Sequence, residues 1–167
     1  MVVITELTVQ NIPDEFILGF RHEQVIPELG EVRRWSREKR LWIAGYLRQQ
    51  IQRGGTAVAA WEEDTLLGFA CADGFLRGER ARYANLTMLF VDDVYKRRGI
   101  GGALFREICT NTAQMGAEKL FISAIPSVET IAFYRHMGCA DAQEILDEYV
   151  DTEHDRYLEY DLTQTEK

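Results

Sequence analysis

The apolar residues of the chain fall into two patterns: short runs typical of strands, and longer stretches in which they recur at helical spacing. Residues 2–9 alternate loosely and contain many β-branched side chains, which predicts a first strand that ends at the turn signal of residues 11–13. The residues that follow this turn are expected to be helical. Between about residues 31 and 53 the apolar and aromatic positions predict the longest helix, with Gly54 and Gly55 as its stop.

The middle of the chain predicts the core of a sheet. Residues 56–61 and 66–72 are short apolar runs separated by polar residues, which is typical of an antiparallel hairpin. Residues 83–91 are apolar almost throughout, so this strand is expected to be central, with both faces covered. Residues 99–115 have the apolar stripe of an amphipathic helix.

The last third predicts a strand, a helix and a final strand pair. Residues 119–125 form the strand, Ser127 is placed to cap the following helix, and Gly138 is placed to end it in the left-handed conformation. Residues 142–150 and 156–162 are expected to pair across a polar turn.

Strands that alternate with helices around mostly antiparallel hairpins indicate an α/β class, or α+β with a mixed sheet. No linker, repeat or low-complexity tract interrupts the chain, so residues 1–167 are expected to form one domain. A chain of this length buries roughly 70% of its unfolded surface, so it needs neither a disulfide nor a metal. Cys71, Cys109 and Cys139 also lack the spacing of a zinc site.

Charge narrows the classes of partner. The chain carries 27 acidic and 19 basic side chains, a formal net charge of −8, and its isoelectric point is about 4.9. Binding to nucleic acid or an anionic membrane draws on a basic surface, so neither partner is expected, whereas a cationic partner fits. No apolar run approaches the roughly 20 residues that span a bilayer, and the first residues lack a signal-peptide pattern. With an odd number of separated cysteines, this predicts a cytoplasmic protein.

One short segment is positively charged, in contrast to the negative net charge of the whole chain. Its four cations are Lys96, Arg97, Arg98 and Arg106, and its glycines are Gly99, Gly101 and Gly102. Backbone N–H groups and the positive end of a helix converge there, which favours phosphate binding, the alternative being a surface loop with solvated arginines. No Lys-Ser or Lys-Thr follows the glycines as in a P-loop, and Leu104 stands where a dinucleotide-binding motif has its third glycine.

The run LFVDDVYKRRGIGGALF resembles the coenzyme A-binding segment of the GNAT superfamily of N-acetyltransferases. The family signature is an apolar-x-Val strand end, an aromatic, and then Arg/Gln-x-x-Gly-x-Gly/Ala, whose six places are residues 96–101. Lys96 stands where Arg or Gln is usual, and Asp93 where Pro is common. Residues 133–139 resemble the end of the family's next helix, with Cys139 in place of Phe. The first third of the chain matches only in pattern.

The resemblance implies a GNAT fold in which the strand before the glycine-rich loop separates from its neighbour, and acetyl-CoA binds in the opening. Leu89 would aim its N–H at the thioester carbonyl, and Phe90 and Val91 would offer backbone groups to the pantetheine arm. The residues assigned around the pyrophosphate are Lys96, Arg97, Arg98, Gly99, Ile100, Gly101, Gly102 and Ala103. Core packing is the alternative for the three strand residues.

The resemblance assigns the general acid to Tyr134, which would protonate the departing thiolate of coenzyme A. A tyrosine with a free pKa of about 10 is neutral at pH 7 and able to donate; the alternative is an aromatic that packs the helix on the sheet. Ser127 lies seven residues earlier and either contacts the cofactor arm or only caps its helix.

The general base has no clear candidate. Relatives often carry Glu or His two or four residues before Leu89, but this chain has Thr87 and Asn85, which either orient a water or are polar core residues. Glu129 is a further candidate for the base, or else a response to the helix dipole. The three histidines are interpreted as surface or structural residues: His22, His136 and His154.

The resemblance places acceptor recognition in the first helices and the last strand pair. The residues there are Trp35, Trp42, Tyr46, Glu144, Asp147, Glu148 and Asp151, which form either an aromatic and acidic pocket for a cationic amine or a core-facing stripe and a solvated edge. We therefore expect an acetyl-CoA-dependent N-acetyltransferase that acts on a primary amine of a small molecule or peptide, without a metal, as a monomer or a homodimer. A non-catalytic acyl-CoA-binding domain is the alternative.

Overall fold

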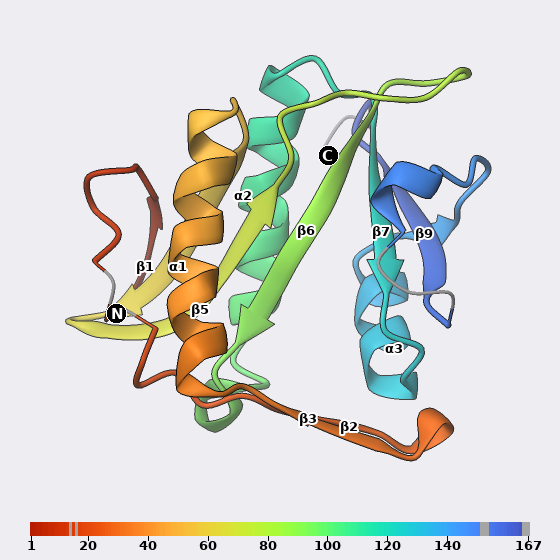
Figure 1. Cartoon of the computed structure of the whole chain (residues 1–167). Coiled ribbons are helices and arrows are strands. Elements are labelled where there is room, and N and C mark those ends of the chain that lie inside the picture. The colour runs from red at the N-terminus through yellow and green to blue at the C-terminus, as the bar shows by residue number, and fades with distance from the viewer. Residues whose placement is uncertain (14, 16, 151–153, 165–167) are drawn as a thin grey trace.

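The structure is a computed structural model that describes residues 1–13, 15, 17–150 and 154–164 (Figure 1). Its strands are β1 (Val2–Glu6), β2 (Glu23–Ile26), β3 (Glu31–Arg34), β4 (Thr56–Glu62), β5 (Thr65–Ala72), β6 (Tyr83–Val91), β7 (Lys119–Ala124), β8 (Ala140–Asp141) and β9 (Arg156–Asp161). Its helices are α1 (Arg37–Gln52), α2 (Ile100–Gln114) and α3 (Val128–His136), with 3₁₀ turns η1 (Pro27–Leu29), η2 (Asp93–Tyr95) and η3 (Asp147–Tyr149).

Seven strands form one sheet in the order β1-β4-β5-β6-β7-β9-β8, and β2 and β3 form a separate hairpin. Neighbours in the large sheet are antiparallel except β6 and β7, which run parallel. The predicted hairpin is β4 and β5, and the predicted central strand is β6 with the same bounds. The expectation of an α/β class with a mixed, mostly antiparallel sheet is confirmed.

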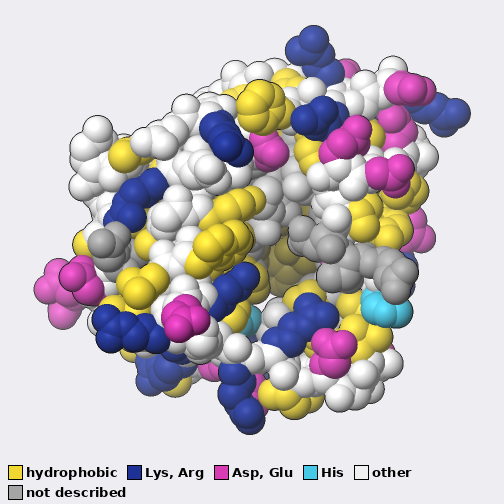
Figure 2. Space-filling view, viewed as in Figure 1, with side chains coloured by type: hydrophobic (Ala, Val, Ile, Leu, Met, Phe, Trp, Pro, Cys, Tyr) yellow, Lys and Arg dark blue, Asp and Glu magenta, His cyan; other side chains and the backbone are white. Residues whose placement is uncertain are grey.

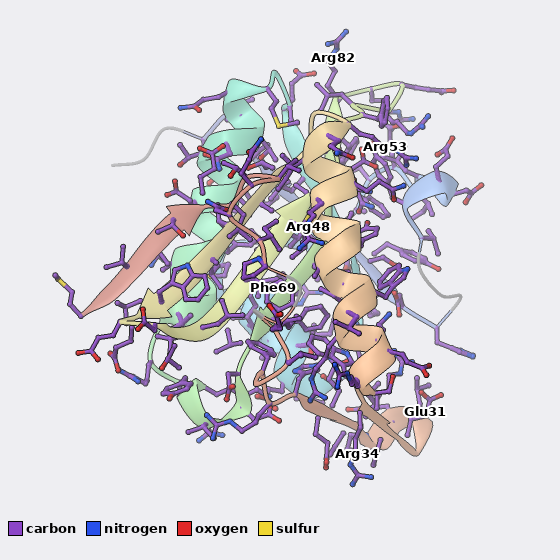
Figure 3. All side chains as sticks on the ribbon, turned by 60° about the vertical axis from the view of Figure 1, so that its left-hand side comes forward. Glu31, Arg34, Arg48, Arg53, Phe69 and Arg82 are labelled. Atoms are coloured by element: carbon purple, nitrogen blue, oxygen red, sulfur yellow. The ribbon has the colours of Figure 1, made fainter. Side chains whose placement is uncertain are left out.

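Helices cover both faces of the sheet (Figure 1). On one face α1 and the segment that precedes it bury a cluster that includes Leu47 and Phe69, and Figure 3 shows Phe69 beneath the helix. On the other face α2 and α3 bury a larger cluster that includes Leu104 and Ile108. Apolar stripes on the helices therefore meet a sheet whose central strands are apolar on both sides, as predicted for β6.

β6 and β7 separate part-way along β6 (Figure 1). Their parallel ladder ends at the pair Asn85–Phe121, and residues 86–91 of β6 pair with β5 alone. A bulge at Thr87 interrupts the β5–β6 register, and bulges bend and twist their strand. The opening between the two strands that the resemblance implied is present.

The predicted helix of residues 31–53 is wrong at its N-terminal end. Residues 31–34 are β3, which returns along β2 after a left-handed turn at Gly30 (φ 63°) and pairs Arg34 with Glu23 at 2.6 Å. α1 begins only after Ser36, whose hydroxyl accepts a hydrogen bond from the Lys39 amide. Among the described residues between β1 and α1 there is one 3₁₀ turn and no α-helix, so the helical material predicted there is also wrong.

The predicted strand of residues 142–150 is wrong as well. Only Ala140–Asp141 form a short strand, and Leu146 and Tyr149 are buried beside Tyr83 in and next to the turn η3. Two buried residues three positions apart suit a 3₁₀ turn, in which such residues share a face, better than a strand.

The second member of the predicted pair is β9, which pairs with both β7 and β8. The polar turn predicted before it includes residues 151–153, which lie outside the described residues. The first strand is shorter than predicted, whereas α2, β7 and α3 lie within one or two residues of their predicted bounds. In the described part of the chain no helix is long and apolar enough to span a membrane.

Candidate active site

β6 presents a backbone edge without a partner strand at the opening. Because the ladder to β7 ends at Asn85, the peptide groups of Leu89, Phe90 and Val91 on that side have no strand partner in the described part of the chain. Leu89 and Val91 pack on the α2 face, and Phe90 on the α1 face. Such edges bind extended ligands through main-chain hydrogen bonds, so this edge can hold an extended arm.

The loop after β6 leads into a helix without a side-chain cap. Gly99 is the N-cap of α2 in the left-handed conformation (φ 78°) and offers no side-chain acceptor to the first-turn amides. Arg97 is also left-handed (φ 68°), an unusual conformation for a non-glycine residue, and it coils the loop. A Cβ on Gly101 would lie 3.2 Å from the Phe133 ring and 3.6 Å from Val91. The glycine therefore lets the positive helix end approach the opening closely, which suits a phosphate.

The basic side chains of this loop differ in their partners. Lys96 pairs with Asp93 at 3.1 Å, and Arg98 pairs with Glu62 at 3.1 Å, whereas Arg97 is exposed. Ion pairs between partly exposed side chains contribute only about 0–1 kcal/mol. These cations can therefore exchange a carboxylate for a phosphate at small cost.

Tyr134 lies in the same core cluster as the edge of β6. It belongs to α3, which Ser127 caps and which ends before the left-handed Gly138 (φ 103°), both as predicted. Its side chain is 7% exposed and shares a cluster with Leu89, and its ring meets Phe105 edge-on at 6.2 Å. Burial raises the pKa of the Tyr134 phenol above its usual value, so the hydroxyl is protonated at neutral pH.

The N-terminus of α3 is occupied by protein groups. The Ser127 hydroxyl accepts a hydrogen bond from the Thr130 amide at 3.1 Å and donates one to the Thr130 hydroxyl at 2.8 Å. The carboxylate of Glu28, at the tip of the β2–β3 hairpin, accepts from the Val128 amide at 3.2 Å. Glu129 is exposed in the same turn, as the helix dipole favours. These contacts support the capping interpretation of Ser127.

Asn85 and Thr87, the predicted water-orienting pair, have different surroundings. Asn85 is 8% exposed at the closed end of the opening, and its side-chain oxygen has no hydrogen-bond partner among the described residues. The Thr87 hydroxyl donates to the Cys71 carbonyl at 3.1 Å, and the bulge at Thr87 interrupts the alternation that places residues two apart on the same face of a strand. A buried acceptor without a donor is costly, so the Asn85 oxygen stands to gain most from a ligand that donates.

The region that holds these features also matches the sequence profile of a known protein family. The sequence profile described as the Acetyltransferase (GNAT) family matches residues 22–139, which include β6, the loop, α2 and α3. The chain belongs to the GNAT acetyltransferase family. A search of curated proteins gives no match.

Solved structures extend the likeness of this GNAT protein over nearly the whole chain. A GNAT-family acetyltransferase from Staphylococcus aureus Mu50 is 14% identical with a TM-score of 0.69, over 98% of this chain and 100% of that one. The Paia N-acetyltransferase from Thermoplasma acidophilum, in complex with coenzyme A, is 17% identical with a TM-score of 0.63, over 96% and 99%. An aminoglycoside 6′-N-acetyltransferase complexed with coenzyme A is 14% identical with a TM-score of 0.64, over 99% of both chains. At such identities the likeness is one of fold.

Sequence reasoning missed where His22 lies in this GNAT fold. It is buried beside the C-terminal half of β6, with its ring centroid 4.9 Å from that of Phe90 and 4.5 Å from that of Trp35. Burial lowers the pKa of its imidazole, although the Asp93 carboxylate, 4.0 Å from Nδ1, acts in the opposite direction. The surface interpretation of His22 is wrong. No local signal marks the residue, because its partners are distant in the sequence.

Two aspartates after β6 hold the N-terminal segment of the GNAT domain against the opening. Asp92 is almost fully buried and accepts hydrogen bonds from the amides of Val94 and Arg21, each at 3.0 Å. Asp93 accepts from the Glu23 amide at 2.8 Å, and its own amide donates to the Arg21 carbonyl at 2.8 Å. A proline at position 93, common in the family, has no N–H for that bond.

The aromatic residues predicted to recognise the acceptor occupy two places. Trp35 meets Phe90 edge-on at 4.9 Å. Trp42 is 51% exposed and stacks on Tyr46 at 5.0 Å on the surface of α1, so this pair is not the core-facing stripe that was the alternative.

The acidic residues predicted to complete that pocket are not all near the opening. The Glu144 carboxylate accepts hydrogen bonds from the amides of Glu79 and Arg80, in the loop that precedes β6, and therefore lies at the end of the strand away from the opening. Asp147 and Glu148 are exposed on η3, and Asp151 lies outside the described residues.

Proposed function

We propose that the protein is an acetyl-CoA-dependent N-acetyltransferase that transfers the acetyl group directly to a primary amine of a small molecule or peptide within a ternary complex. The observation that carries this proposal is a convergence at one opening. An unpaired strand edge at Leu89–Val91, an uncapped helix start at Gly99 and the buried neutral phenol of Tyr134 meet there. The strand edge would bind an extended arm, the helix start would bind a phosphate, and the phenol would donate a proton.

The residues present fit coenzyme A. The backbone of Leu89, Phe90 and Val91 would pair with the arm, and the amides of residues 99–103 would face the diphosphate beside the loop cations. The tight contact of Gly101 with Phe133 supports this, because a side chain at 101 would push the helix start away. Two structures of the same fold hold coenzyme A. When bound, acetyl-CoA would supply an acetyl group activated as a thioester.

The Leu89 amide would stabilise the negative charge that develops on the acyl oxygen. A preorganised backbone donor of this kind contributes about 3–4 kcal/mol to catalysis in enzymes where one has been removed. The role requires only the N–H, so the half-buried Leu89 side chain remains free to pack in the core.

Tyr134 would act as the general acid. Its hydroxyl holds a proton at neutral pH because burial raises the pKa of the phenol, and it belongs to the cluster that includes Leu89. The phenol would give its proton to the departing thiolate, and the proton that the attacking nitrogen releases on becoming an amide would restore the phenol, because burial disfavours a lasting phenolate. General acids of this kind contribute roughly 10²- to 10⁴-fold to the rate.

Asn85 would orient a water that carries the proton away from the acceptor nitrogen, through a side-chain oxygen that has no hydrogen-bond partner among the described residues. An alkylamine with a pKa near 10 must lose a proton before it attacks, which costs about 4 kcal/mol at pH 7. An amide cannot remove that proton. A weakly basic amine, or a water that carries the proton away, therefore suits this site better than a strongly basic amine alone.

Direct transfer is favoured over a covalent acyl-enzyme. Burial raises the thiol pKa of Cys71 and of Cys139 to about 12, so neither is a thiolate at neutral pH. Cys71, Cys109 and Cys139 are all free thiols, which accords with a cytoplasmic location. We further propose that residues 1–167 act as one domain, as a monomer or a homodimer.

The test is thermal unfolding with and without acetyl-CoA, followed by release of free thiol across amines, polyamines, aminoglycosides and short peptides. Stabilisation by acetyl-CoA together with amine-dependent thiol release is the expected result. Stabilisation without release for any amine would favour a non-catalytic acyl-CoA-binding domain. No stabilisation at any concentration would reject the cofactor assignment.

A further inference from the structure

The β2–β3 hairpin crosses the wide end of the opening. At its base the Glu23 amide donates to the Asp93 carboxylate at 2.8 Å, just after β6 ends. At its tip the Glu28 carboxylate accepts from the Val128 amide at 3.2 Å, where α3 begins after β7. Figure 1 shows the hairpin running from below the end of β6 to below α3, while β6 and β7 diverge toward it. The hairpin therefore links the two sides of the opening where they are farthest apart.

The hairpin packs against the rest of the protein with one face. An isolated two-stranded ribbon covers neither of its faces and is only marginally stable. Val25 and Val32 pair across the two strands and are 56% and 52% exposed, so they lie on the outer face. Ile26, whose side chain points to the other face, is fully buried, which requires residues from beyond the hairpin to cover it. The inner face is thus turned toward the protein, in agreement with the contact between Glu28 and Val128.

Aromatic rings fill the base of the hairpin. His22 precedes β2 and Trp35 follows β3, and the ring centroid of each lies 4.9 Å from that of Phe90. The Arg21 amide donates to the Asp92 carboxylate at 3.0 Å, which fixes the chain just before His22. These rings and hydrogen bonds hold the base of the hairpin against the end of β6.

The opening is therefore bounded at both ends along its strands. The pair Asn85–Phe121 closes the narrow end, and the hairpin crosses the wide end. An acceptor must bring its amine to the edge of β6 at Leu89, between these two ends. Figure 2, seen from the same side as Figure 1, shows a hollow at the centre of this face, above the region of the hairpin. A hollow bounded at both ends suits a small molecule, whereas a groove with open ends can hold the middle of a chain.

We propose that the hairpin limits the acceptor to a small free amine and excludes the amine of a lysine within a polypeptide chain. A polypeptide continues in both directions from such a lysine, and the hairpin would stand in the path of one of them. A small amine has no such continuation. This inference rests on the proposed acyl transfer and narrows its acceptor class.

The experiment measures release of free thiol from saturating acetyl-CoA with five acceptors. They are tyramine, spermidine, kanamycin, Nα-acetyl-L-lysine amide and the heptapeptide acetyl-Gly-Ser-Gly-Lys-Gly-Ser-Gly amide. The last two compounds present the same lysine amine and differ only in the flanking chain. Nα-acetyl-L-lysine amide is expected to exceed the heptapeptide in kcat/KM by about tenfold or more, because the flanking chain clashes with the hairpin.

Two variants assign this preference to the hairpin. The first replaces residues 25–32 with Asn-Gly, which joins the cross-strand partners Gln24 and Arg33 through a two-residue turn and leaves the base intact. It should acetylate the heptapeptide about as fast as Nα-acetyl-L-lysine amide. The second, Glu28→Ala, keeps the hairpin and removes its hydrogen bond to the start of α3, so it should raise transfer to the heptapeptide severalfold.

The matched control is Glu31→Ala. Glu31 is exposed on the same hairpin and pairs with Arg33 at 3.0 Å, within the hairpin, so its removal should leave the preference unchanged. Hydrogen exchange at the Val128 amide gives a readout that does not depend on transfer. Exchange should be faster in Glu28→Ala than in the wild type and unchanged in Glu31→Ala, because the Val128 amide donates to Glu28.

Equal kcat/KM of the wild type for Nα-acetyl-L-lysine amide and the heptapeptide would overturn the inference. So would a shortened hairpin that binds acetyl-CoA and still does not acetylate the heptapeptide. If the shortened protein does not fold, an unchanged preference in Glu28→Ala has the same consequence, as does exchange at Val128 that Glu28→Ala leaves unaltered.

Transfer to none of the five acceptors, while acetyl-CoA still raises the unfolding temperature, would also overturn the inference and leave the cofactor site standing. Only the absence of acetyl-CoA binding by the wild type would count against the proposed cofactor site itself.

Discussion

The two sides of the opening between β6 and β7 are built from different kinds of group. The proposed cofactor side is the backbone of one continuous stretch, from Leu89 on β6 through the loop to the first turn of α2. The proposed acceptor side consists of side chains from distant segments, among them His22 and Trp35, which lie against Phe90. Backbone donors do not depend on the side chain at their position, whereas each substitution on the acceptor side changes its chemistry. If the proposed function holds, the fold specifies the donor, and individual side chains specify the acceptor.

The largest effect is expected at Tyr134, which belongs to neither side. Tyr134→Phe should lower kcat by about 10²- to 10⁴-fold, because it removes the proton donor but keeps the ring. Stabilisation by acetyl-CoA should persist, since the cofactor side is unchanged. Tyr160→Phe is the matched control, because Tyr160 packs edge-on against the same Phe105 ring at 5.2 Å. Equal losses in the two variants would show that Tyr134 only packs.

A substitution at Asn85 tests whether its side-chain oxygen takes part in the transfer reaction. Asn85→Leu should lower kcat/KM for the amine by about tenfold to a hundredfold, because the water that takes the proton from the acceptor nitrogen loses its partner. It should not lower the unfolding temperature, since the side-chain oxygen has no partner to lose.

The control for Asn85 shows the opposite pattern. The Asn111 side chain donates to the Thr56 hydroxyl at 2.9 Å on the α2 side of the sheet. Asn111→Leu should therefore lower stability and leave kcat/KM unchanged. Loss of stability without loss of transfer in Asn85→Leu would make Asn85 a structural residue.

The cofactor side could be predicted from the sequence because it is local. The strand, the glycine-rich loop and the helix follow one another between residues 83 and 115, and their bounds and caps match the prediction closely. Helix signals also act within one turn, which is why the Ser127 cap and the stop at Gly138 were predicted correctly.

The acceptor side could not be predicted in the same way because it depends on long-range contacts. The sequence predicts helix for the residues of β3, whose strand conformation depends on pairing with β2, including the Arg34–Glu23 ion pair. Nothing near Glu144 in the sequence reveals that its carboxylate bonds to the amides of Glu79 and Arg80. His22 is defined by rings from two other elements.

Gly68, on the strand next to β6, tests whether acetyl-CoA binding depends on the position of the β6 backbone. It lies on β5 opposite Val91, and a Cβ there would sit 2.8 Å from the Phe90 carbonyl oxygen and 3.0 Å from the Leu104 side chain. Gly68→Ala should therefore lower the free energy of unfolding by about 1–2 kcal/mol and weaken acetyl-CoA binding severalfold, because the edge of β6 must shift. Urea unfolding and titration with acetyl-CoA measure the two effects.

The matched control is Gly45→Ala on α1, where no heavy atom lies within 4 Å of the added Cβ. Alanine is the better helix former, so this variant should raise the free energy of unfolding by about 0.5–1 kcal/mol. Its acetyl-CoA binding should be unchanged. A Gly68→Ala variant that also binds acetyl-CoA normally would contradict a backbone-built cofactor side.

The smallest effect is expected on acidification, and it should originate on the acceptor side. The pKa of His22 in the folded protein lies below the usual histidine value of about 6.5, chiefly because of burial, with Lys96 and Arg40 acting in the same direction and Asp93 against it. As pH falls below about 6.5, the unfolded chain binds a proton that the folded chain does not, so stability is lost from there down to the folded pKa. The slope from one such group is at most about 1.4 kcal/mol per pH unit.

His22→Phe, which keeps a ring between Phe90 and Trp35, should flatten the decline in urea stability between pH 7.5 and 5.5. The control His136→Gln, at an exposed position of α3, should not. Parallel curves for wild type and His22→Phe would mean that His22 titrates as freely in the folded protein as in the unfolded chain, and that the acceptor side has no acid-sensitive element at this position.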